Sequence, residues 1–440
     1  MTASPLPAEE DGEISAIQRE VGDLRRRLEE LEARLQFLLE KKEAAAEAGT
    51  VPGETGTDDR MAATEKPATN NERIEVVNTE PPPGPDISAG GRIYFDAIYN
   101  SRSGGGGSNR ADQAFNPAAI PVEGSGEDHQ TAYSARDSRL WVKAHSPTAI
   151  GDLAGYIEID FVGGGGNERV SNSYNPRLRH AYAVYKGLTL GQTYTGFLNL
   201  SAYPETNDSN GPAGILNIRQ PLLRYQHPFH WGDLTLGLEQ PETTLTTAGG
   251  SLAVDDDRVP DIVTRLDFSG DWGNWSLAGL IRQIRHDSAE AFVAADSQWG
   301  GAVSASGRIY IGDRDNLRFS LAYGNALGRY LSFNSFDDGV LDGRGNITLT
   351  DVLGGFLSYQ HWWDETLRSS LTVGYARADH DLLIAPAEIN KSFYSAHINL
   401  LWSPTLNTSI GIEWLYGHRK LEDGRDGELN RFQFTSSYKF

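Results

Sequence analysis

Cysteine is absent from the 440 residues of this chain, and so is any long apolar run. The first absence excludes disulfide frameworks, thiolate metal sites and cysteine nucleophiles. The second excludes a helical membrane protein, because a spanning helix needs about 18 or more consecutive apolar residues. A membrane-spanning β-barrel stays possible. Its strands alternate apolar and polar residues, so they leave little trace in the mean hydropathy, which is −0.45 here.

Basic residues are also scarce. The chain has 39 lysines and arginines against 60 aspartates and glutamates, which gives a formal net charge of −21. Phosphate binding needs a basic face, so we expect no nucleic-acid partner. The 48 glycines and the 10% of aromatic residues favour a β protein with many turns.

Apolar residues near the N-terminus recur in alternating steps of three and four, which is a heptad seam. The seam consists of Ile14, Ile17, Val21, Leu24, Leu28, Leu31, Leu35 and Leu38. Flanking charges, such as Glu20 opposite Arg25 of a neighbouring helix, support parallel self-association. We predict a disordered segment over 1–13 and an oligomerising coiled coil over 14–43. An amphipathic helix packed on its own domain is the alternative, and the leucine-rich seam leaves two, three or four strands open.

The periodicity is lost over 44–86, where Ala, Thr, Glu, Gly and Pro dominate and the segment ends in three prolines, a glycine and a proline. This composition predicts a linker that is stiff at its end. The first residues show no basic segment followed by an apolar run. We therefore expect the sequence to represent the mature form of an exported protein, with Met1 added.

From residue 87 to residue 440 the chain consists of short alternating segments separated by Gly, Asn and Asp clusters. In the first segment, Ile93, Phe95 and Tyr99 form an apolar phase, and Arg92 and Asp96 belong to a polar phase. The last segment repeats this pattern, with an apolar phase of Phe432, Phe434, Tyr438 and Phe440. Roughly sixteen such segments fit into the region, to within one hairpin.

Alternation alone does not separate a soluble sandwich from a membrane barrel. Segment lengths near the 9–11 residues that cross a bilayer at a tilt favour the barrel. So does the alternation of short turns, such as 228–233, with long loops, such as 100–132. Tryptophans also gather at segment ends, where membrane interfaces would lie. They are Trp231, Trp272, Trp275, Trp362, Trp363, Trp402 and Trp414.

We therefore predict an all-β transmembrane barrel of about 16 antiparallel strands over 87–440, preceded by the N-terminal α-helical coiled coil. The expected location is the outer membrane, with the coiled coil in the periplasm.

Enzyme motifs are missing. The chain has no GxSxG, GxxxxGK[ST] or HExxH pattern, and its histidines show no metal-ligand spacing. His397, beside Ser395 and Asn399, hints at a hydrolase, but a polar barrel interior explains these residues better. The acidic stretches at 255–257 and 422–427 lack the spacing of a calcium-binding loop. We expect no catalysis, no metal site and no cofactor.

Six short motifs and the last residue carry a resemblance. They are Arg177-Leu-Arg-His-Ala-Tyr182, Leu190-Gly-Gln-Thr193, Tyr203-Pro-Glu-Thr-Asn-Asp208, Asn210-Gly-Pro212, Arg219-Gln-Pro221, Arg224-Tyr225 and Phe440. As a set they resemble the DcaP-like trimeric porins and, more distantly, the phosphate-selective porins. The resemblance implies three barrels per assembly, each of about sixteen strands, and a basic lumen that suits small anions such as dicarboxylates. It also implies that the barrel assembly machinery recognises Phe440.

The candidate site is a loop near 199–214 that, by the resemblance, folds inward as a constriction. Its polar members are Tyr203, Glu205, Asn207, Asp208 and Asn210. An ordinary surface loop is the alternative. Arginines in the polar phase of neighbouring strands would form the opposite wall and select anions. They are Arg92, Arg139, Arg177, Arg179, Arg265, Arg308 and Arg318, and the resemblance alone adds Arg219 and Arg224. For each arginine, pairing with a lumen acid is the alternative. Arg177 and Arg179 form the favoured pair, because residues two apart face the same way.

Two functions from different classes fit these features. The first is passive diffusion of small hydrophilic solutes, above all anions such as dicarboxylates, with selectivity that weakens when Arg177 or Arg179 becomes alanine. The second is a plugged or adhesive surface barrel without conductance. Residues 1–88 have too few apolar residues outside the heptad seam to form a plug, which favours the channel. We also expect a homotrimer held through coiled coil and barrel walls, and contact with outer-membrane lipid and lipopolysaccharide.

Overall fold

The structure is a computed structural model, and it describes residues 84–103, 113–167, 170–254, 256–287 and 295–440. The predictions for 1–13, 14–43 and nearly all of the linker lie outside the described residues. The first strand begins at Asp86, one residue before the predicted start of the barrel.

Seventeen strands form one continuous sheet. They are β1 (Asp86–Ser103), β2 (Glu127–Ser134), β3 (Arg139–Thr148), β4 (Gly151–Asp160), β5 (Arg177–Tyr185), β6 (Leu188–Tyr194), β7 (Arg219–Phe229), β8 (Gly232–Glu239), β11 (Asp261–Gly270), β12 (Gly273–His286), β13 (Asp296–Ile311), β14 (Asp315–Gly324), β17 (Asp351–Trp362), β18 (Leu367–Asp379), β19 (Asn390–Thr405), β20 (Thr408–Leu421) and β21 (Asp426–Lys439). Each strand pairs antiparallel with the next one around the sheet. Four short strands form a separate sheet: β9 (Thr243–Thr247), β10 (Gly250–Val254), β15 (Gly339–Leu341) and β16 (Ile347–Leu349).

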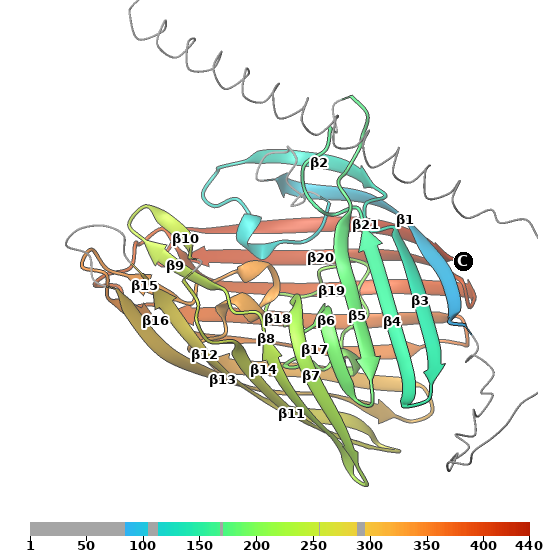
Figure 1. The fold of residues 1–440 in the computed structure, drawn as a ribbon. Coiled ribbons are helices and arrows are strands. Elements are labelled where there is room, and N and C mark those ends of the chain that lie inside the picture. The colour runs from blue at the N-terminus through green and yellow to red at the C-terminus, as the bar shows by residue number, and fades with distance from the viewer. Residues whose placement is uncertain (1–83, 104–112, 168–169, 255, 288–294) are drawn as a thin grey trace, which may run out of the picture. The chain divides into compact units, whose positions relative to one another are not determined.

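The large sheet closes on itself between β1 and β21, over a register from Arg92 opposite Lys439 to Asn100 opposite Arg431 (Figure 1). On its other edge β1 pairs first with β3 and then with β2. β2 and β3 therefore share one position in the wall, interrupted at 135–138, and the seventeen strands occupy sixteen positions. The predicted barrel of about sixteen antiparallel strands is confirmed.

The two faces of the wall have opposite chemistry. Outward side chains are apolar and exposed, such as Ile93 at 56%, Val303 at 64% and Leu321 at 57%. Inward side chains are polar and buried, such as Thr235 and Thr372, both at 0%. A soluble sandwich would bury the apolar phase instead, so this inversion places hydrocarbon outside the wall.

Connections alternate in length around the barrel. One end carries turns of two to four residues at 149–150, 186–187, 230–231, 271–272, 312–314, 363–366 and 406–407. The N-terminal end of β1 and the C-terminal end of β21 also lie at this end, which we call the short-turn end. The other end carries the longer connections, including 104–126, 195–218, 240–260 and 325–350, and one short connection at 422–425. No helix within the described residues is long and apolar enough to cross a membrane.

Aromatic rings mark the short-turn end, as expected for a membrane interface. Phe229 at the end of β7, Trp231 in the turn before β8, Phe268 of β11 and Trp275 of β12 stack in a row, with centroid distances of 5.2, 5.2 and 4.5 Å. Trp414 departs from the expected pattern. It lies in the middle of β20, opposite Phe432, where its indole N–H donates to Asn430 at 3.2 Å. That side-chain partner satisfies the polar atom away from the interface.

Three of the longer connections fold back into the barrel and build an apolar core there. Phe115 and Ile120, from the first connection, pack against Leu415 and Leu429. Residues of 195–218 and 325–350 pack together against the inner faces of β11 to β19, and a single bridge pairs Leu216 with Leu331. Their shared cluster includes Phe197, Leu198, Ala213, Leu216, Leu327, Tyr330, Leu331, Phe336, Val263, Val352 and Phe393.

Arg282 on β12 fixes the 325–350 connection. Its guanidinium donates to Asp261 at 3.0 Å and to Asp338 at 2.6 Å. The arginine is 1% exposed, and both carboxylates are fully buried. A charge group of this kind is costly to break, because removing one member leaves the others buried without a partner.

Arg282→Gln is therefore expected to destabilise the barrel by about 3–5 kcal/mol. The temperature at which the folded band is lost on a gel measures this change. Arg314→Gln is the matched control. Arg314 also pairs with a carboxylate, Glu365 at 2.9 Å, but the two side chains are 48% and 83% exposed, so its loss should cost less than about 1 kcal/mol. Equal shifts in the two variants would contradict the role given to Arg282.

Candidate functional site

The connection between β6 and β7, residues 195–218, leaves the wall and runs across the barrel interior. Near its start, the Arg265 guanidinium on β11 donates to the carbonyls of Gly196, at 2.8 Å, and Leu198. The Asn199 amide then donates to Ser276 on β12 at 2.6 Å. A short helix, η3 (Leu200–Ala202), follows. These contacts carry the loop from its own strands toward the far wall.

Glu205 anchors the middle of the loop to β18. Its carboxylate accepts two hydrogen bonds from Arg368, at 2.7 and 2.5 Å, and one from Gln360 on β17. Burial raises the pKa of the Glu205 carboxyl, but hydrogen bonds and the charge of Arg368 outweigh burial and hold that pKa below its ordinary value. The carboxylate is therefore ionised at neutral pH, in a bidentate charge-assisted pair.

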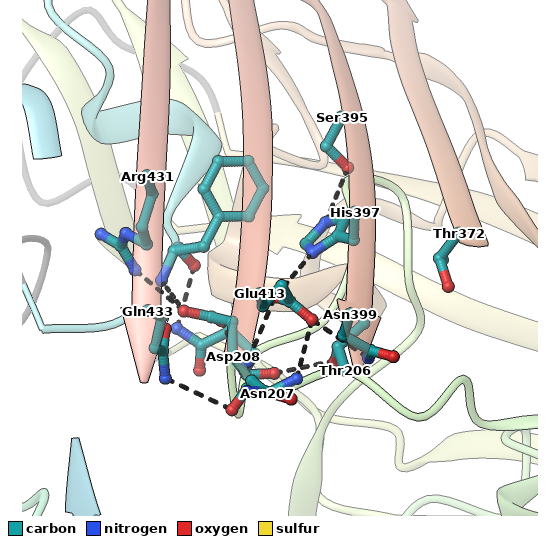
Figure 2. A network of polar contacts seen from close by, with 12 residues as sticks. Thr206, Asn207, Asp208, Thr372, Ser395, His397, Asn399, Glu413, Arg431 and Gln433 are labelled. Carbon is teal, nitrogen blue, oxygen red and sulfur yellow. Dashed lines mark hydrogen bonds and ion pairs between the residues drawn. The ribbon is translucent and has the colours of Figure 1, made fainter. Parts of the chain in front are cut away.

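Asp208 anchors the next part of the loop to β21 (Figure 2). Its Oδ2 accepts from Arg431 at 2.8 Å and from the backbone N–H of Phe115 at 2.7 Å. Asp208 is 0% exposed and Arg431 is 1% exposed. On β20, the Glu413 carboxylate accepts from the backbone N–H groups of Asn207, at 2.8 Å, and Asp208, at 3.3 Å. Buried carboxylates thus fix both the side chains and the main chain of the loop.

Ser395, His397 and Glu413 form a hydrogen-bonded row beside this anchor (Figure 2). The His397 ring lies 3.2 Å from both Ser395 Oγ and Glu413 Oε1. The order is that of a nucleophile, base and acid in a hydrolase. However, Ser395 is 0% exposed, and its Oγ accepts from the Ala213 backbone N–H at 2.9 Å. The hydroxyl is covered by the loop, so the row positions the loop rather than a substrate.

The nine arginines singled out from the sequence all occupy barrel strands, and eight of them are partly exposed. Arg179 is the buried one, with its side chain 5% exposed. Four of the nine pair with a wall carboxylate. Arg177 and Arg179 both bind Asp160, at 2.6 and 2.8 Å, and Arg179 also binds Glu158 at 2.5 Å. The other two pairs are Arg139 with Glu158 at 3.9 Å and Arg265 with Asp267 at 2.8 Å.

The remaining five have no carboxylate within ion-pair distance in the part of the chain that the structure describes: Arg92, Arg219, Arg224, Arg308 and Arg318. Arg219 and Arg224 both donate hydrogen bonds to Tyr194. Arg219 donates to the Tyr194 hydroxyl at 3.0 Å with its guanidinium 5.0 Å from the ring centroid, and Arg224 donates to the Tyr194 carbonyl at 3.3 Å. The two arginines are five positions apart, so strand alternation places them in opposite phases unless a bulge intervenes, and the register of β7 shows no bulge at Pro221. Arg219 reaches Tyr194 because it is the first residue of β7, opposite Tyr194 in the register.

Aromatic side chains border these arginines on the inner wall. The His180 ring lies 5.9 Å from Tyr156 and 5.2 Å from Tyr194, and Tyr194 lies 6.5 Å from Tyr203 of the loop. Tyr94 of β1 has the guanidinium groups of Arg92 and Arg139 at 5.5 and 5.6 Å from its ring. The wall from β1 to β7 therefore presents partly exposed cations on aromatic surfaces.

The loop residues singled out from the sequence divide between side-chain and main-chain roles. Glu205 and Asp208 bind Arg368 and Arg431, as described above. The Tyr203 hydroxyl donates to the Leu216 carbonyl at 2.7 Å, and the Asn210 amide donates to the Phe115 carbonyl at 2.9 Å. Asn207 is buried and contributes its main chain, as a donor to Glu413 and an acceptor from Gln433.

Sequence reasoning missed Arg282, Arg368 and Arg431 as functional residues, although they hold the inner loops in place. Arg431 alternates with the apolar residues Phe432 and Phe434 in the last strand. Its place in the polar, inward phase could therefore be predicted from the sequence. Arg282 shares its inward phase with Ala278, Leu280 and Ile284, because the apolar inner core covers this part of β12. The polar-inward pattern therefore fails locally. Among the described residues, no group of three or more His, Asp or Glu side chains could hold a metal ion.

The comparisons with known proteins agree with this geometry. The DcaP outer membrane protein family matches residues 20–440. The outer membrane channel DcaP of Acinetobacter baumannii is 23% identical, with a TM-score of 0.70 over 81% of this chain and 98% of that one. OmpT of Vibrio cholerae is 9% identical, with a TM-score of 0.50 over 81% of this chain and 98% of that one. No curated protein matches. Since the family match spans more than nine-tenths of the sequence, the chain belongs to the DcaP outer membrane protein family.

Proposed function

We propose that this outer-membrane porin passes small anionic solutes, including dicarboxylates, by passive diffusion between the 195–218 loop and the wall formed by β1 and β3–β7. The observation that carries the proposal is the group of partly exposed arginines without a carboxylate partner in the described structure, above all Arg219 and Arg224 at Tyr194. A fixed guanidinium compensates an anion for lost water and repels cations.

Single-channel recording of the purified protein in planar bilayers, in a KCl gradient, tests the proposal. We expect stepwise conductance with a reversal potential on the anion side. Current that reverses on the cation side would overturn the anionic preference while keeping the channel. A plugged or adhesive barrel is the second candidate, and the apolar core inside the barrel supports it. It predicts silence from folded protein.

The pH dependence of the current follows from Glu205. A carboxyl whose pKa is lowered in the folded state contributes stability above its unfolded pKa and loses it as the pH falls through the folded one. The Glu205–Arg368 anchor should therefore persist from about pH 7 to about pH 5. We expect constant conductance over this range and an increase only below the ordinary carboxyl pKa of 4.5. A change centred between about pH 6 and 7 would come from other titratable groups, such as a histidine, and would not report on this anchor.

We also propose that copies of the barrel associate, as a homotrimer, through the outer face of β3–β6. β5 and β6 have 9 and 7 residues, whereas β13 and β19 have 16. Crossing a bilayer takes about 9–11 residues per strand. The side of the barrel with the short strands β5 and β6 would therefore expose loop backbone to lipid unless another copy covered it. Small residues flatten this face and leave a hollow of about 370 Å³. They are Ala144, Gly155, Ala181 and Ala183.

Ala183→Trp is expected to convert the trimer to monomers on a native gel, because a large ring fills the contact surface. Val303→Trp, on the opposite outer wall where the side chain is 64% exposed, is the matched control and should leave the trimer intact. An unchanged trimer in Ala183→Trp would refute this interface. The N-terminal coiled coil remains a further proposed contribution to the assembly.

Phe440 supports the proposed recognition by the barrel assembly machinery. Its side chain is 55% exposed, and its backbone N–H donates to the Gly91 carbonyl at 3.0 Å, which extends the closing seam. The apolar outer band described above is the proposed contact with lipid and with lipopolysaccharide.

A further inference from the structure

Two arginines lie directly opposite each other on the inner wall near the short-turn end. Arg308 of β13 and Arg318 of β14 are register partners. Both belong to the inward phase, since Ser306 and Ser320 next to them in phase are buried. Like charges directly opposite on one face of a sheet destabilise it. The pair therefore needs a source of negative charge to offset its repulsion.

The described structure supplies only neutral acceptors to these two guanidinium groups. Arg318 donates to Asn316 Oδ1 at 2.8 Å, to the Tyr203 carbonyl at 2.6 Å and to Gln360 Oε1 at 3.2 Å. Arg308 lies over the Tyr310 ring, 4.7 Å from its centroid, and donates to the Tyr310 hydroxyl. Its Nε is buried and makes no hydrogen bond.

The nearby carboxylates are already engaged. Glu205 accepts both hydrogen bonds of Arg368, at 2.7 and 2.5 Å. Glu365 lies at the rim, where it is 83% exposed and pairs with Arg314 at 2.9 Å. Neither one forms an ion pair with Arg308 or Arg318 in the described structure. Glu205 attracts Arg318 at longer range, but no carboxylate in the described structure pairs directly with either arginine, although the chain as a whole carries a net charge of −21.

A cavity of about 450 Å³ opens in front of the pair. Besides the arginine pair, its lining consists of Tyr310, Asn316, Gln360 and Trp362, with the Arg314–Glu365 ion pair at the rim. Hydroxyl and amide groups beside two guanidinium groups match the oxygen atoms of a carboxylate or a phosphate, and a tryptophan ring adds an apolar side. The volume exceeds that of a small anion and leaves room for its water.

We propose that Arg308 and Arg318 together bind one small oxyanion, a carboxylate or a phosphate, in this cavity. The site lies at the short-turn end, apart from the Arg219 and Arg224 pair at Tyr194. It rests on the proposed function and deepens it by giving the anion a binding site beside the 195–218 loop, whose Tyr203 carbonyl accepts from Arg318. The bound anion bridges the two arginines and offsets their repulsion, so it stabilises β13 against β14.

Isothermal titration calorimetry of the full-length protein in detergent, with sodium phosphate and with sodium acetate as separate probes, tests the proposal. We expect saturable binding of one anion or both, and the stronger probe tells a phosphate site from a carboxylate site. Arg308→Gln/Arg318→Gln should weaken binding by about tenfold or more, because charged hydrogen-bond partners are lost. Arg258→Gln is the matched control: it removes an exposed cation that pairs with Asp287 at 2.8 Å in the 240–260 connection, away from this cavity, and should keep the affinity.

Two further variants separate this site from the conducting pathway. Arg219→Gln/Arg224→Gln should bind phosphate or acetate with the affinity of wild type. The calorimetric result for Arg308 and Arg318 therefore holds even if the recordings show no anion selectivity. Arg318→Lys keeps the charge and serves if the double variant does not fold; it should bind more weakly than wild type because the fork of donors is lost. Equal affinity in wild type and Arg308→Gln/Arg318→Gln, or no binding of either probe, would overturn the proposal.

Discussion

Replacing Arg219 and Arg224 together by glutamine is expected to move the reversal potential in a KCl gradient toward zero. A unit charge about 4 Å from an ion in a water-like medium contributes about 1 kcal/mol, which is about fivefold in local anion concentration. Two such charges at one narrow place dominate the discrimination between Cl⁻ and K⁺. The reversal potential measures the loss, and the difference from wild type should shrink at high salt because screening shortens the range of the charges.

The matched control removes one positive and one negative charge from the same wall. Arg177 binds Asp160 at 2.6 Å, so Arg177→Gln/Asp160→Asn deletes an ion pair without changing the net charge. We expect its reversal potential to stay close to that of wild type. If this variant lost as much selectivity as Arg219→Gln/Arg224→Gln, the selectivity would not come from arginines without carboxylate partners.

The favoured pair of the sequence analysis illustrates what residue patterns can and cannot determine. Arg177 and Arg179 were singled out because they lie two apart on one strand. Both also contact Asp160, which lies on the neighbouring strand and becomes a partner only through the register of β4 and β5. Phase predicts the face of a side chain. Whether a charge on that face is free or paired depends on the neighbouring strand.

The barrel itself was predictable for the opposite reason. Alternation between an apolar outer face and a polar inner face is local, and each strand carries it independently. This alternation is lost where the inner loops, rather than water, cover the inner face of the wall. Arg282 is an example, because its inward neighbours on β12 are apolar. The contacts that anchor the loop could not be predicted from the sequence either. Glu413 is about two hundred residues from Asn207 in sequence, and nothing in either segment specifies that its carboxylate accepts from that backbone N–H.

Asp208→Ala is expected to release the 195–218 loop and to raise both the single-channel conductance and the current noise. The change removes the Asp208 carboxylate from Arg431, which is 1% exposed and also donates to Asn100 at 2.7 Å, and it removes the acceptor of the Phe115 backbone N–H. Breaking a buried pair in this way costs about 3–5 kcal/mol. That cost falls on the loop first, because each wall strand keeps its ladder of backbone hydrogen bonds. Loop motion on the microsecond to millisecond scale then appears as flicker in the current.

A double-mutant cycle decides whether the loop is held by this pair or by the network as a whole. Arg431→Met also breaks the pair, but the Asp208 carboxylate still accepts from the Phe115 backbone N–H at 2.7 Å. We expect it to raise the noise less than Asp208→Ala does. In the combined variant the two effects should not add, with a coupling of about 0.5–3 kcal/mol in the stability of the folded barrel. Asp379→Asn, at a carboxylate 80% exposed to water, is the surface control. Quiet, wild-type currents from folded Asp208→Ala would mean that this anchor does not hold the loop, and that Glu205 and Glu413 are sufficient.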